Sequence, residues 1–259
     1  MEQLVHFDND YGEKLTGTLH LPDAPTGCGI VFGHCFTCSR HTTILRRICS
    51  DLILEDFMAL RFDFSGNGQS EGEFEKSTYS KQISEMKTAA ALLAREGAVW
   101  IGLAGHSMGA AIALLTAAQL DIVKAVCVLA GRLSGLDAAH FLSPDQRRQL
   151  QSAGSVSFSS RGRSLELSNR FFADAGQYNL PQVVAALQPP LLVVHGDHDE
   201  IIPVQEAYQA QALNPVGTTL AVIPDADHMF SKAQHSRQIS NLVVTWFKEQ
   251  KKENPHGPF

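Results

Sequence analysis

"LAGHSMGAAIALL", residues 103–115, places Ser107 between two glycines and surrounds this motif with apolar residues. The five residues GHSMG match the pattern G-x-S-x-G, which forms a sharp turn between a strand and a helix in proteins that use the serine as a nucleophile. Gly105 and Gly109 would leave the space that such a turn needs. Serine is also a common N-cap of helices, so the motif alone allows a purely structural role for Ser107. The sequence on either side of the motif is therefore needed to distinguish a nucleophile from a helix N-cap.

Short apolar segments alternate with helical patterns on both sides of the motif. Near-continuous apolar runs are typical of parallel strands that are covered on both faces. Such runs predict strands at Gly29–Gly33, Phe57–Phe64, Val99–Gly105, Val123–Gly131, Pro190–Asp197 and Thr218–Pro224. Helices are predicted at Thr42–Glu55, Ser80–Glu96, Ser107–Gln119, Val204–Leu213 and Ser231–Glu249. This alternation predicts an α/β fold with a doubly wound, mostly parallel sheet.

Two segments depart from the alternation. Residues 3–7 and 13–21 flank the turn-forming sequence DNDYG, which predicts an antiparallel hairpin at one edge of the sheet. Arg132–Ala186 is too long for an ordinary connection and contains the hairpin-like sequence SVSFSSRGRSLEL, with helical stretches at Ser143–Gln151 and Ser168–Asp174. We expect residues 132–186 to form a lid inserted into a core built from residues 1–131 and 187–259.

The composition excludes several classes of protein. A formal net charge of −6 and short, scattered basic clusters give no indication of a nucleic-acid partner. No apolar run approaches the length of a membrane span, and the N-terminus carries acidic residues without the apolar core of a signal peptide. The five cysteines are odd in number and lie mostly among apolar residues, which favours a reducing cytoplasm over secretion. We therefore expect a cytoplasmic protein with no membrane or nucleic-acid partner.

A nucleophilic serine needs a base, and two later segments supply the residues for it. A serine hydroxyl reacts slowly unless a histidine, itself held by a carboxylate, accepts its proton. In this kind of fold the chain order is serine, acid, histidine, and each follows a strand. Asp199 follows the strand at 190–197 and His228 follows the strand at 218–224. Asp197 competes with Asp199 for the role of the acid, but its place directly after a glycine favours a turn.

Four stretches make the chain resemble a known family. They are His34–Cys38 (HCFTC), Arg61–Glu75 (RFDFSGNGQSEGEFE), Gly105–Gly109 (GHSMG) and Asp225–Ser231 (DADHMFS). Over essentially its whole length the chain is similar to the α/β-hydrolase superfamily, and within it to the cinnamoyl (feruloyl) esterase group. It also resembles the hydrolase half of proteins that carry a fused hydroperoxide-reductase-like domain. One departure is Cys35, which stands where the esterases usually have glycine.

The resemblance implies a serine esterase that needs no cofactor. It assigns Ser107 as the nucleophile, Asp199 as the acid and His228 as the base. Two backbone N–H groups must stabilise the oxyanion of the tetrahedral intermediate, and Phe36 and Met108 match the family's donors. The inserted segment matches the lid that shapes an acyl or aromatic pocket.

Substrate choice is expected to depend on the insertion and on the loop after the strand at 29–33. Phe158 and Phe172 offer an apolar lining, and together with His34 they are our candidate substrate contacts. Arg161 and Arg163 could meet a carboxylate or a polar leaving group, although the tip of a hairpin is also a common place for solvated arginines.

Cys35 and Cys38 form a C-x-x-C pair, which is typical of zinc or redox sites. A second cysteine pair and suitably spaced histidines are missing from the sequence, so we expect no metal. A reactive thiol at Cys35 remains an alternative because this residue lies near the predicted site.

These patterns together predict a serine carboxylic-ester hydrolase for small acyl or aromatic, cinnamoyl-type esters. An acyl-thioesterase or a peptidase would use the same triad, and a non-catalytic ligand-binding protein would use the same fold. The expected partner is a small-molecule ester. The edge of the hairpin predicted within the lid would also allow two copies of the chain to pair as a homodimer.

Overall fold

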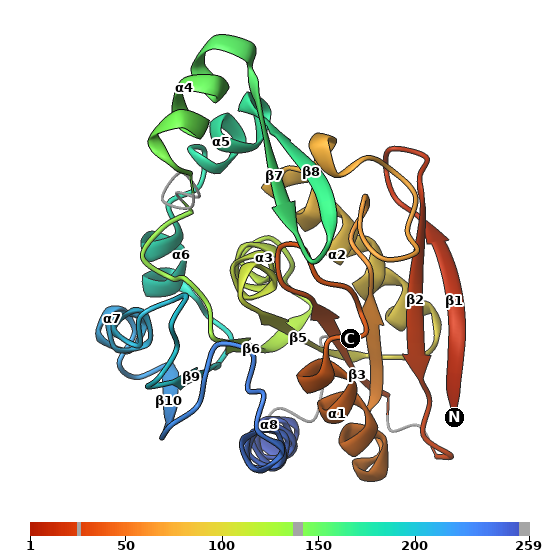
Figure 1. Ribbon diagram of the computed structural model, residues 1–259. Helices are drawn as coiled ribbons and strands as arrows, with labels where there is room; N and C mark the ends of the chain where they lie inside the picture. The colour runs from red at the N-terminus through yellow and green to blue at the C-terminus, as the bar shows by residue number, and fades with distance from the viewer. Residues whose placement is uncertain (25–26, 137–141, 254–259) are drawn as a thin grey trace.

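One large mixed sheet organises the part of the chain that the computed structural model describes, residues 1–24, 27–136 and 142–253 (Figure 1). Its strands lie in the order β1-β2-β4-β3-β5-β6-β9-β10. The pairs from β4 to β10 are parallel, whereas β1 pairs antiparallel with β2 and β2 pairs antiparallel with β4. The predicted parallel sheet and its antiparallel edge hairpin are therefore confirmed. The strands are β1 (Glu2–Asp8), β2 (Lys14–His20), β3 (Cys28–Gly33), β4 (Met58–Phe62), β5 (Trp100–His106), β6 (Val123–Leu129), β9 (Leu191–Gly196) and β10 (Thr218–Ile223).

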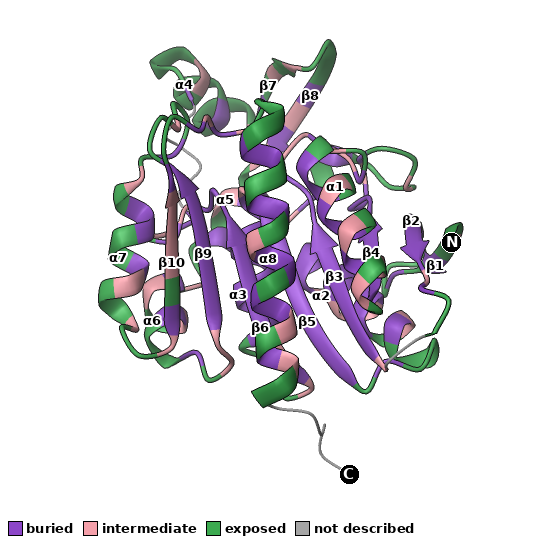
Figure 2. Cartoon of the chain, turned by 90° about the horizontal axis from the view of Figure 1, so that it is seen from below, coloured by how far each residue is buried: buried purple, intermediate pink, exposed green. Residues whose placement is uncertain are grey.

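Helices cover both faces of this sheet, as the alternation of strands and helices predicts (Figure 2). Among the described helices, none combines the length and the apolar character that crossing a membrane requires. The helices are α1 (Thr43–Leu52), α2 (Tyr79–Arg95), α3 (Met108–Ala117), α4 (Pro144–Ala153), α5 (Asn169–Ala175), α6 (Leu180–Ala186), α7 (Gln205–Leu213) and α8 (Ala233–Glu253), with short 3-10 turns η1 (Ile53–Glu55) and η2 (Phe74–Lys76).

The hydrophobic core has two layers, one on each face of the sheet. Side chains alternate across a strand, so neighbouring residues of β3 enter different layers. Val31 packs with residues of α2 and α3, whereas Ile30 and Phe32 pack with residues of α1 and α8. Helix α3 is buried at every one of its positions, which agrees with its Ala-rich, apolar sequence. The sheet and α3 therefore form the rigid centre from which the loops at the carboxyl ends of the strands extend.

The segment between β6 and β9 contains a separate two-stranded sheet, β7 (Ser155–Ser160) with β8 (Arg163–Ser168), and the helices α4, α5 and α6. Figure 1 shows α4, α5 and the hairpin together at one end of the molecule. The hairpin and the first two helices were predicted, but α6 was not. Its start signals are present in the sequence: Asn179 accepts a hydrogen bond from the N–H of Gln182 at 3.2 Å, and Pro181 lies in the first turn.

Polar contacts fix this segment against the rest of the chain. The N–H of Ser80, in α2, donates to Asp174 at 2.9 Å, and the hydroxyl of Ser80 lies 2.7 Å from that of Tyr178. The hydroxyl of Ser160, at the end of β7, lies 2.8 Å from that of Thr37. The hairpin is thus held directly against the loop that follows β3.

Candidate active site

Ser107 lies in a sharp turn between β5 and α3. Its backbone has φ 58° and ψ −117°, a conformation that non-glycine residues adopt only when the surrounding structure imposes it. A Cβ atom on Gly105 would lie 2.0 Å from the carbonyl oxygen of Gly109, and one on Gly109 would lie 2.3 Å from that of Gly33. The two glycines therefore allow β3, β5 and α3 to approach closely. Ser107 occupies the N-cap position of α3, yet its side chain makes no capping hydrogen bond, so its hydroxyl serves another interaction.

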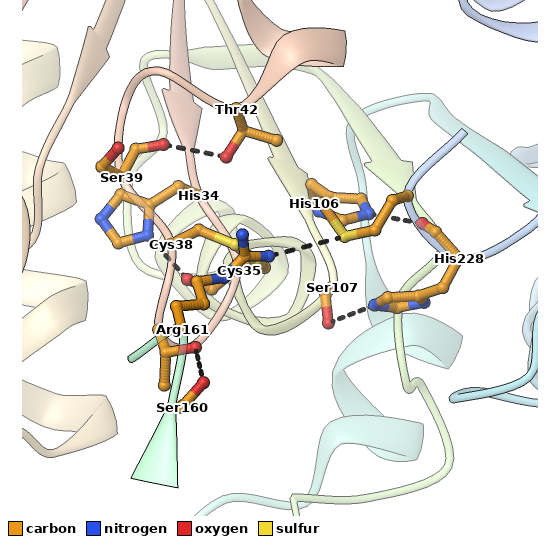
Figure 3. Close-up of a disulfide and its surroundings, with 12 residues drawn as sticks. His34, Cys35, Cys38, Ser39, Thr42, His106, Ser107, Ser160, Arg161 and His228 are labelled. Carbon is orange, nitrogen blue, oxygen red and sulfur yellow. Dashed lines mark hydrogen bonds between the residues drawn. A yellow bond between two sulfur atoms is a disulfide. The ribbon is translucent and has the colours of Figure 1, made fainter. Parts of the chain in front are cut away.

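The hydroxyl of Ser107 belongs to a chain of three hydrogen-bonded side chains, of which Figure 3 shows Ser107 and His228. Its Oγ lies 3.1 Å from Nε2 of His228, and Nδ1 of His228 lies 2.8 Å from Oδ2 of Asp199. The three residues follow β5, β10 and β9, whose carboxyl ends meet at one edge of the sheet. The structure thus brings the three predicted residues together in the order that a nucleophile, a base and an orienting acid need.

The loop after β3 is closed by a disulfide between Cys35 and Cys38 (Figure 3). The carbonyl oxygen of Cys35 accepts hydrogen bonds from the N–H of Cys38 at 3.1 Å and from Nδ1 of His34 at 2.7 Å. This disulfide was not predicted from the C-x-x-C spacing, and it leaves Cys35 without the free, reactive thiol that was the alternative for this residue. Phe36 lies between them, and its ring stacks on Phe158 of β7 with the ring centres 5.9 Å apart.

His34 has a structural position below this loop. It is completely buried, its Nε2 accepts a hydrogen bond from the N–H of Phe64 at 3.0 Å, and its Nδ1 donates to Cys35. Burial also lowers the pKa of His34, which keeps the ring neutral. Because both ring nitrogens are occupied, His34 shapes the loop rather than meeting a ligand directly, and its predicted contact with substrate finds no support in this placement.

A cavity of about 480 Å³ opens above Ser107 and His228. Phe36, Phe158 and other apolar residues form much of its wall, and the polar side chains of Gln146, Arg161 and Glu200 also line it. Of the predicted substrate contacts, Phe158 therefore reaches the cavity. Phe172 instead packs on Phe171, with the ring centres 5.5 Å apart. Phe141, an aromatic residue of the same insertion, lies outside the described residues.

Comparison with known protein families identifies one family. Residues 30–239, which make up most of the chain, match the alpha/beta hydrolase family. The chain belongs to the alpha/beta hydrolase family. Its eight-stranded sheet, antiparallel edge hairpin and flanking helices confirm the predicted α/β-hydrolase fold.

Solved structures of esterases are among the structural relatives of this hydrolase. Est1E from Butyrivibrio proteoclasticus with ferulic acid bound superimposes with a TM-score of 0.79 and 25% identity, covering 95% of this chain and 98% of the other. The esterase domain of a Rhodothermus marinus protein gives a TM-score of 0.72 and 25% identity, with 95% and 97% covered. Two Mycobacterium tuberculosis proteins with the provisional name phosphoribosyl transferase are 25% identical over 237 residues. That match covers 90% of this chain and 43% of theirs, so the chain spans less than half the length of these curated relatives.

Asp199 of the hydrolase is held as a carboxylate by several donors. Burial opposes its charge, but hydrogen bonds from His195, His228 and the N–H of Ile202 outweigh that effect and hold its pKa well below the ordinary range. Oδ1 accepts the N–H groups of Ile201 and Ile202 at 2.9 and 2.8 Å. Nε2 of His195 lies 3.2 Å from Oδ2. This role of His195 was not predictable from the sequence, because the turn after β9, and not a motif, brings its ring to Asp199.

His106 supports the same site from below. It is the residue before Ser107, it is completely buried, and its Nε2 donates to the carbonyl oxygen of His228 at 2.8 Å (Figure 3). Burial and the nearby His228 lower the pKa of His106 to about 3, so the ring is neutral near pH 7. His106 therefore ties the loop that carries His228 to the strand that carries Ser107.

Asp199→Asn is expected to destabilise the fold in a pH-dependent way. A carboxyl group with a lowered pKa in the folded state stabilises the protein above its ordinary pKa of 3.8, and this contribution is lost as the pH falls through the folded-state value. We expect the variant to lose about 2 kcal/mol of unfolding free energy at pH 7, and a smaller amount below about pH 4. Urea denaturation at several pH values measures this. Asp197→Asn, at an exposed carboxylate nearby, is the control, and an Asp199→Asn deficit that stays constant with pH would contradict the expectation.

Proposed function

We propose that this hydrolase is a serine carboxylesterase that works through an acyl-enzyme at Ser107. The hydrogen-bonded chain of Ser107, His228 and Asp199 at the base of a largely apolar cavity carries this proposal. A serine held in a strained turn, with a histidine nitrogen at its hydroxyl and a buried carboxylate behind that histidine, has the arrangement needed for nucleophilic attack. The esterases among the structural relatives support the same chemistry.

The proposed reaction assigns one step to each of these groups. Nε2 of His228 accepts the proton of the Ser107 hydroxyl as Oγ attacks the ester carbonyl carbon, and Asp199 stabilises the imidazolium that forms. The N–H of Met108 is the first of α3, where no intrahelical acceptor exists, and it directly follows the nucleophile. We assign it and the N–H of Phe36 as donors to the oxyanion. His228 then protonates the departing alkoxide, and water repeats the sequence to release the acid.

The walls of the cavity favour a small acyl or aromatic ester. Phe36 and Phe158 stack against each other at the cavity, and their rings offer faces on which a planar, cinnamoyl-type group could pack. Ferulic acid, bound in the Est1E structure, is a group of this kind. In this proposal residues 132–186 act as the lid, because Phe158 comes from that segment while Ser107 and His228 come from the main sheet.

A panel of substrates tests the proposal. Purified protein is offered p-nitrophenyl esters of increasing acyl length, methyl ferulate, an acyl thioester and a peptide anilide, and a fluorophosphonate probe is used to label the nucleophile. We expect turnover of esters and a labelled peptide that contains Ser107. Turnover confined to the thioester or the anilide would reassign the leaving group, and failure to label Ser107 together with no turnover would refute the proposed activity.

Reduction of the Cys35–Cys38 disulfide is expected to lower kcat by about tenfold. Phe36 lies between the two cysteines, so the disulfide restrains the loop that carries one oxyanion donor, and loosening a donor costs less than the roughly 100- to 1,000-fold loss that follows its removal. Dithiothreitol supplies the reductant: its two thiols become a cyclic disulfide as the two cysteines become thiols. The Cys35→Ser/Cys38→Ser double variant is the control. Its kcat should be lowered to the same extent and should not change when dithiothreitol is added. Unchanged kcat in wild-type protein whose two thiols can be alkylated would contradict this expectation.

A further inference from the structure

A second cavity lies directly beside the one that holds Ser107. Its volume is about 350 Å³, and Thr37, Arg161 and Met229 line both cavities. The two spaces therefore meet at the turn of the β7–β8 hairpin. A molecule whose reacting bond lies at Ser107 could extend one end past Arg161 into the second cavity.

The second cavity is lined by cations and hydrogen-bonding groups. Arg161 and Arg163 enter it from the hairpin turn, and three threonines and one serine supply hydroxyl groups. Among the described residues that line it, none carries a carboxylate. This is an unusual surrounding in a chain whose net charge is −6, and it gives the cavity a local positive charge beside the reaction site.

Among the described residues, no carboxylate forms an ion pair with Arg161 or Arg163. Arg163 donates to the carbonyl oxygen of Gly66 at 3.1 Å, and Arg161 lies 4.0 Å from the sulfur of Met229. Glu200 lines the catalytic cavity together with Arg161, but its carboxylate approaches the N–H of His228 at 3.5 Å instead. Both guanidinium groups therefore keep N–H donors for a ligand.

The hairpin turn that carries these arginines is held in place before any ligand arrives. The hydroxyl groups of Ser160 and Thr37 lie 2.8 Å apart, and the contact of Arg163 with Gly66 ties the other strand to the loop after β4. Groups that are already positioned lose less conformational freedom on binding, which favours affinity. A planar guanidinium also matches the paired oxygens of a carboxylate or a phosphate.

We infer that the second cavity binds an anionic group of the substrate, a carboxylate or a phosphate, while the bond to be cleaved lies at Ser107. This inference rests on the proposed function and names its substrate class: an ester or thioester with a negative charge several bonds from the reacting carbonyl. A carboxylate would belong to the acyl group, whereas a phosphate would belong to the leaving group. Arg161 and Arg163 determine specificity in both cases.

Two matched pairs of substrates distinguish these sources of charge. Mono-p-nitrophenyl glutarate differs from p-nitrophenyl valerate by a carboxylate on the acyl group, and butyryl-4′-phosphopantetheine differs from butyrylpantetheine by a phosphate on the leaving group. We expect Arg161→Gln and Arg163→Gln to lower kcat/KM for the charged member of one pair about tenfold more than for its neutral partner. Arg170→Gln is the matched control, because Arg170 is exposed on the same inserted segment and lines neither cavity.

Binding without turnover separates this inference from the proposed esterase activity. Monomethyl glutarate and 4′-phosphopantetheine are titrated calorimetrically into Ser107→Ala protein, with and without Arg161→Gln. Arginine-dependent binding would support the anionic site; if the wild-type protein also cleaves none of the four substrates and the fluorophosphonate does not label Ser107, the esterase is refuted while the anionic site stands. The opposite result is that esters are cleaved, the arginine variants lower kcat/KM equally for charged and neutral substrates, and binding does not depend on Arg161. That result would overturn the anionic site and leave the esterase activity standing. Loss of the same size in Arg170→Gln would also overturn it.

Discussion

Ser107→Ala is expected to lower kcat for ester hydrolysis by about 10⁴-fold or more while the protein stays folded. The substitution removes the proposed attacking oxygen and leaves the cavity, the proposed lid and the proposed oxyanion donors in place, so only the residual effect of binding and oxyanion stabilisation remains. The folded state loses one hydrogen bond, the 3.1 Å contact with His228. A shift of the melting temperature by no more than a few degrees is therefore expected.

Stopped assays with high enzyme concentration and calorimetric melting measure the two quantities. Ser152→Ala is the matched control, because Ser152 is exposed on α4 and does not line the cavity. Retention of a tenth or more of wild-type kcat by Ser107→Ala would rule out this serine as the nucleophile. A collapse of the melting temperature would show that Ser107 is needed for the fold, and the fluorophosphonate label would then have to decide its chemical role.

Gly109→Ala is expected to damage both stability and activity. The added Cβ would lie 2.3 Å from the carbonyl oxygen of Gly33 and 2.7 Å from that of His34, so α3 and the loop after β3 must move apart. Overpacking of this kind costs about 3 kcal/mol. The same displacement moves Met108 and Phe36, the two proposed oxyanion donors, so we expect kcat/KM to fall by about 100-fold or more.

Gly135→Ala provides the comparison for this variant. A Cβ at Gly135 meets no atom of the described residues within 4 Å, and its backbone does not have the positive φ that disfavours alanine. Melting curves and kcat/KM of the two variants should therefore differ sharply. Equal stability and activity would mean that α3 and β3 can relax without disturbing the site.

Most of this fold was predictable from local sequence patterns, because strands and turns depend on residues that are only a few positions apart. Every predicted strand of the main sheet appears with bounds shifted by a few residues. The candidate triad was predictable for a related reason: Ser107, Asp199 and His228 each follow a strand, and parallel strands bring their carboxyl ends together. Helix α6 was not predicted because it is only 7 residues long and its start signals, Asn179 and Pro181, are also typical of turns.

Contacts between distant loops were not predictable from the sequence. The hydrogen bond from His106 to the carbonyl oxygen of His228 joins residues 122 positions apart, and no periodic pattern encodes such a pair. The turn after β9 brings Nε2 of His195 to the carbonyl oxygen of Ile202 at 2.9 Å and to Asp199 at 3.2 Å, and both contacts depend on how tightly that turn closes. The second cavity arises only when the hairpin turn meets the loop after β3, so the spacing of Arg161 and Arg163 alone could not distinguish a ligand site from a solvated tip.

The buried thiols of Cys49 and Cys127 can serve as probes of local unfolding in this protein. Cys49 lies on α1 and Cys127 in β6, both are fully buried, and burial raises the pKa of each thiol. A maleimide can react with either one only during a fluctuation that uncovers it, so the labelling rate reports how often that part of the chain opens. Strand β6 lies in the middle of the sheet, whereas α1 packs on one of its faces. Cys49 should therefore be labelled whenever this one helix detaches, and Cys127 should be labelled only when the whole sheet unfolds.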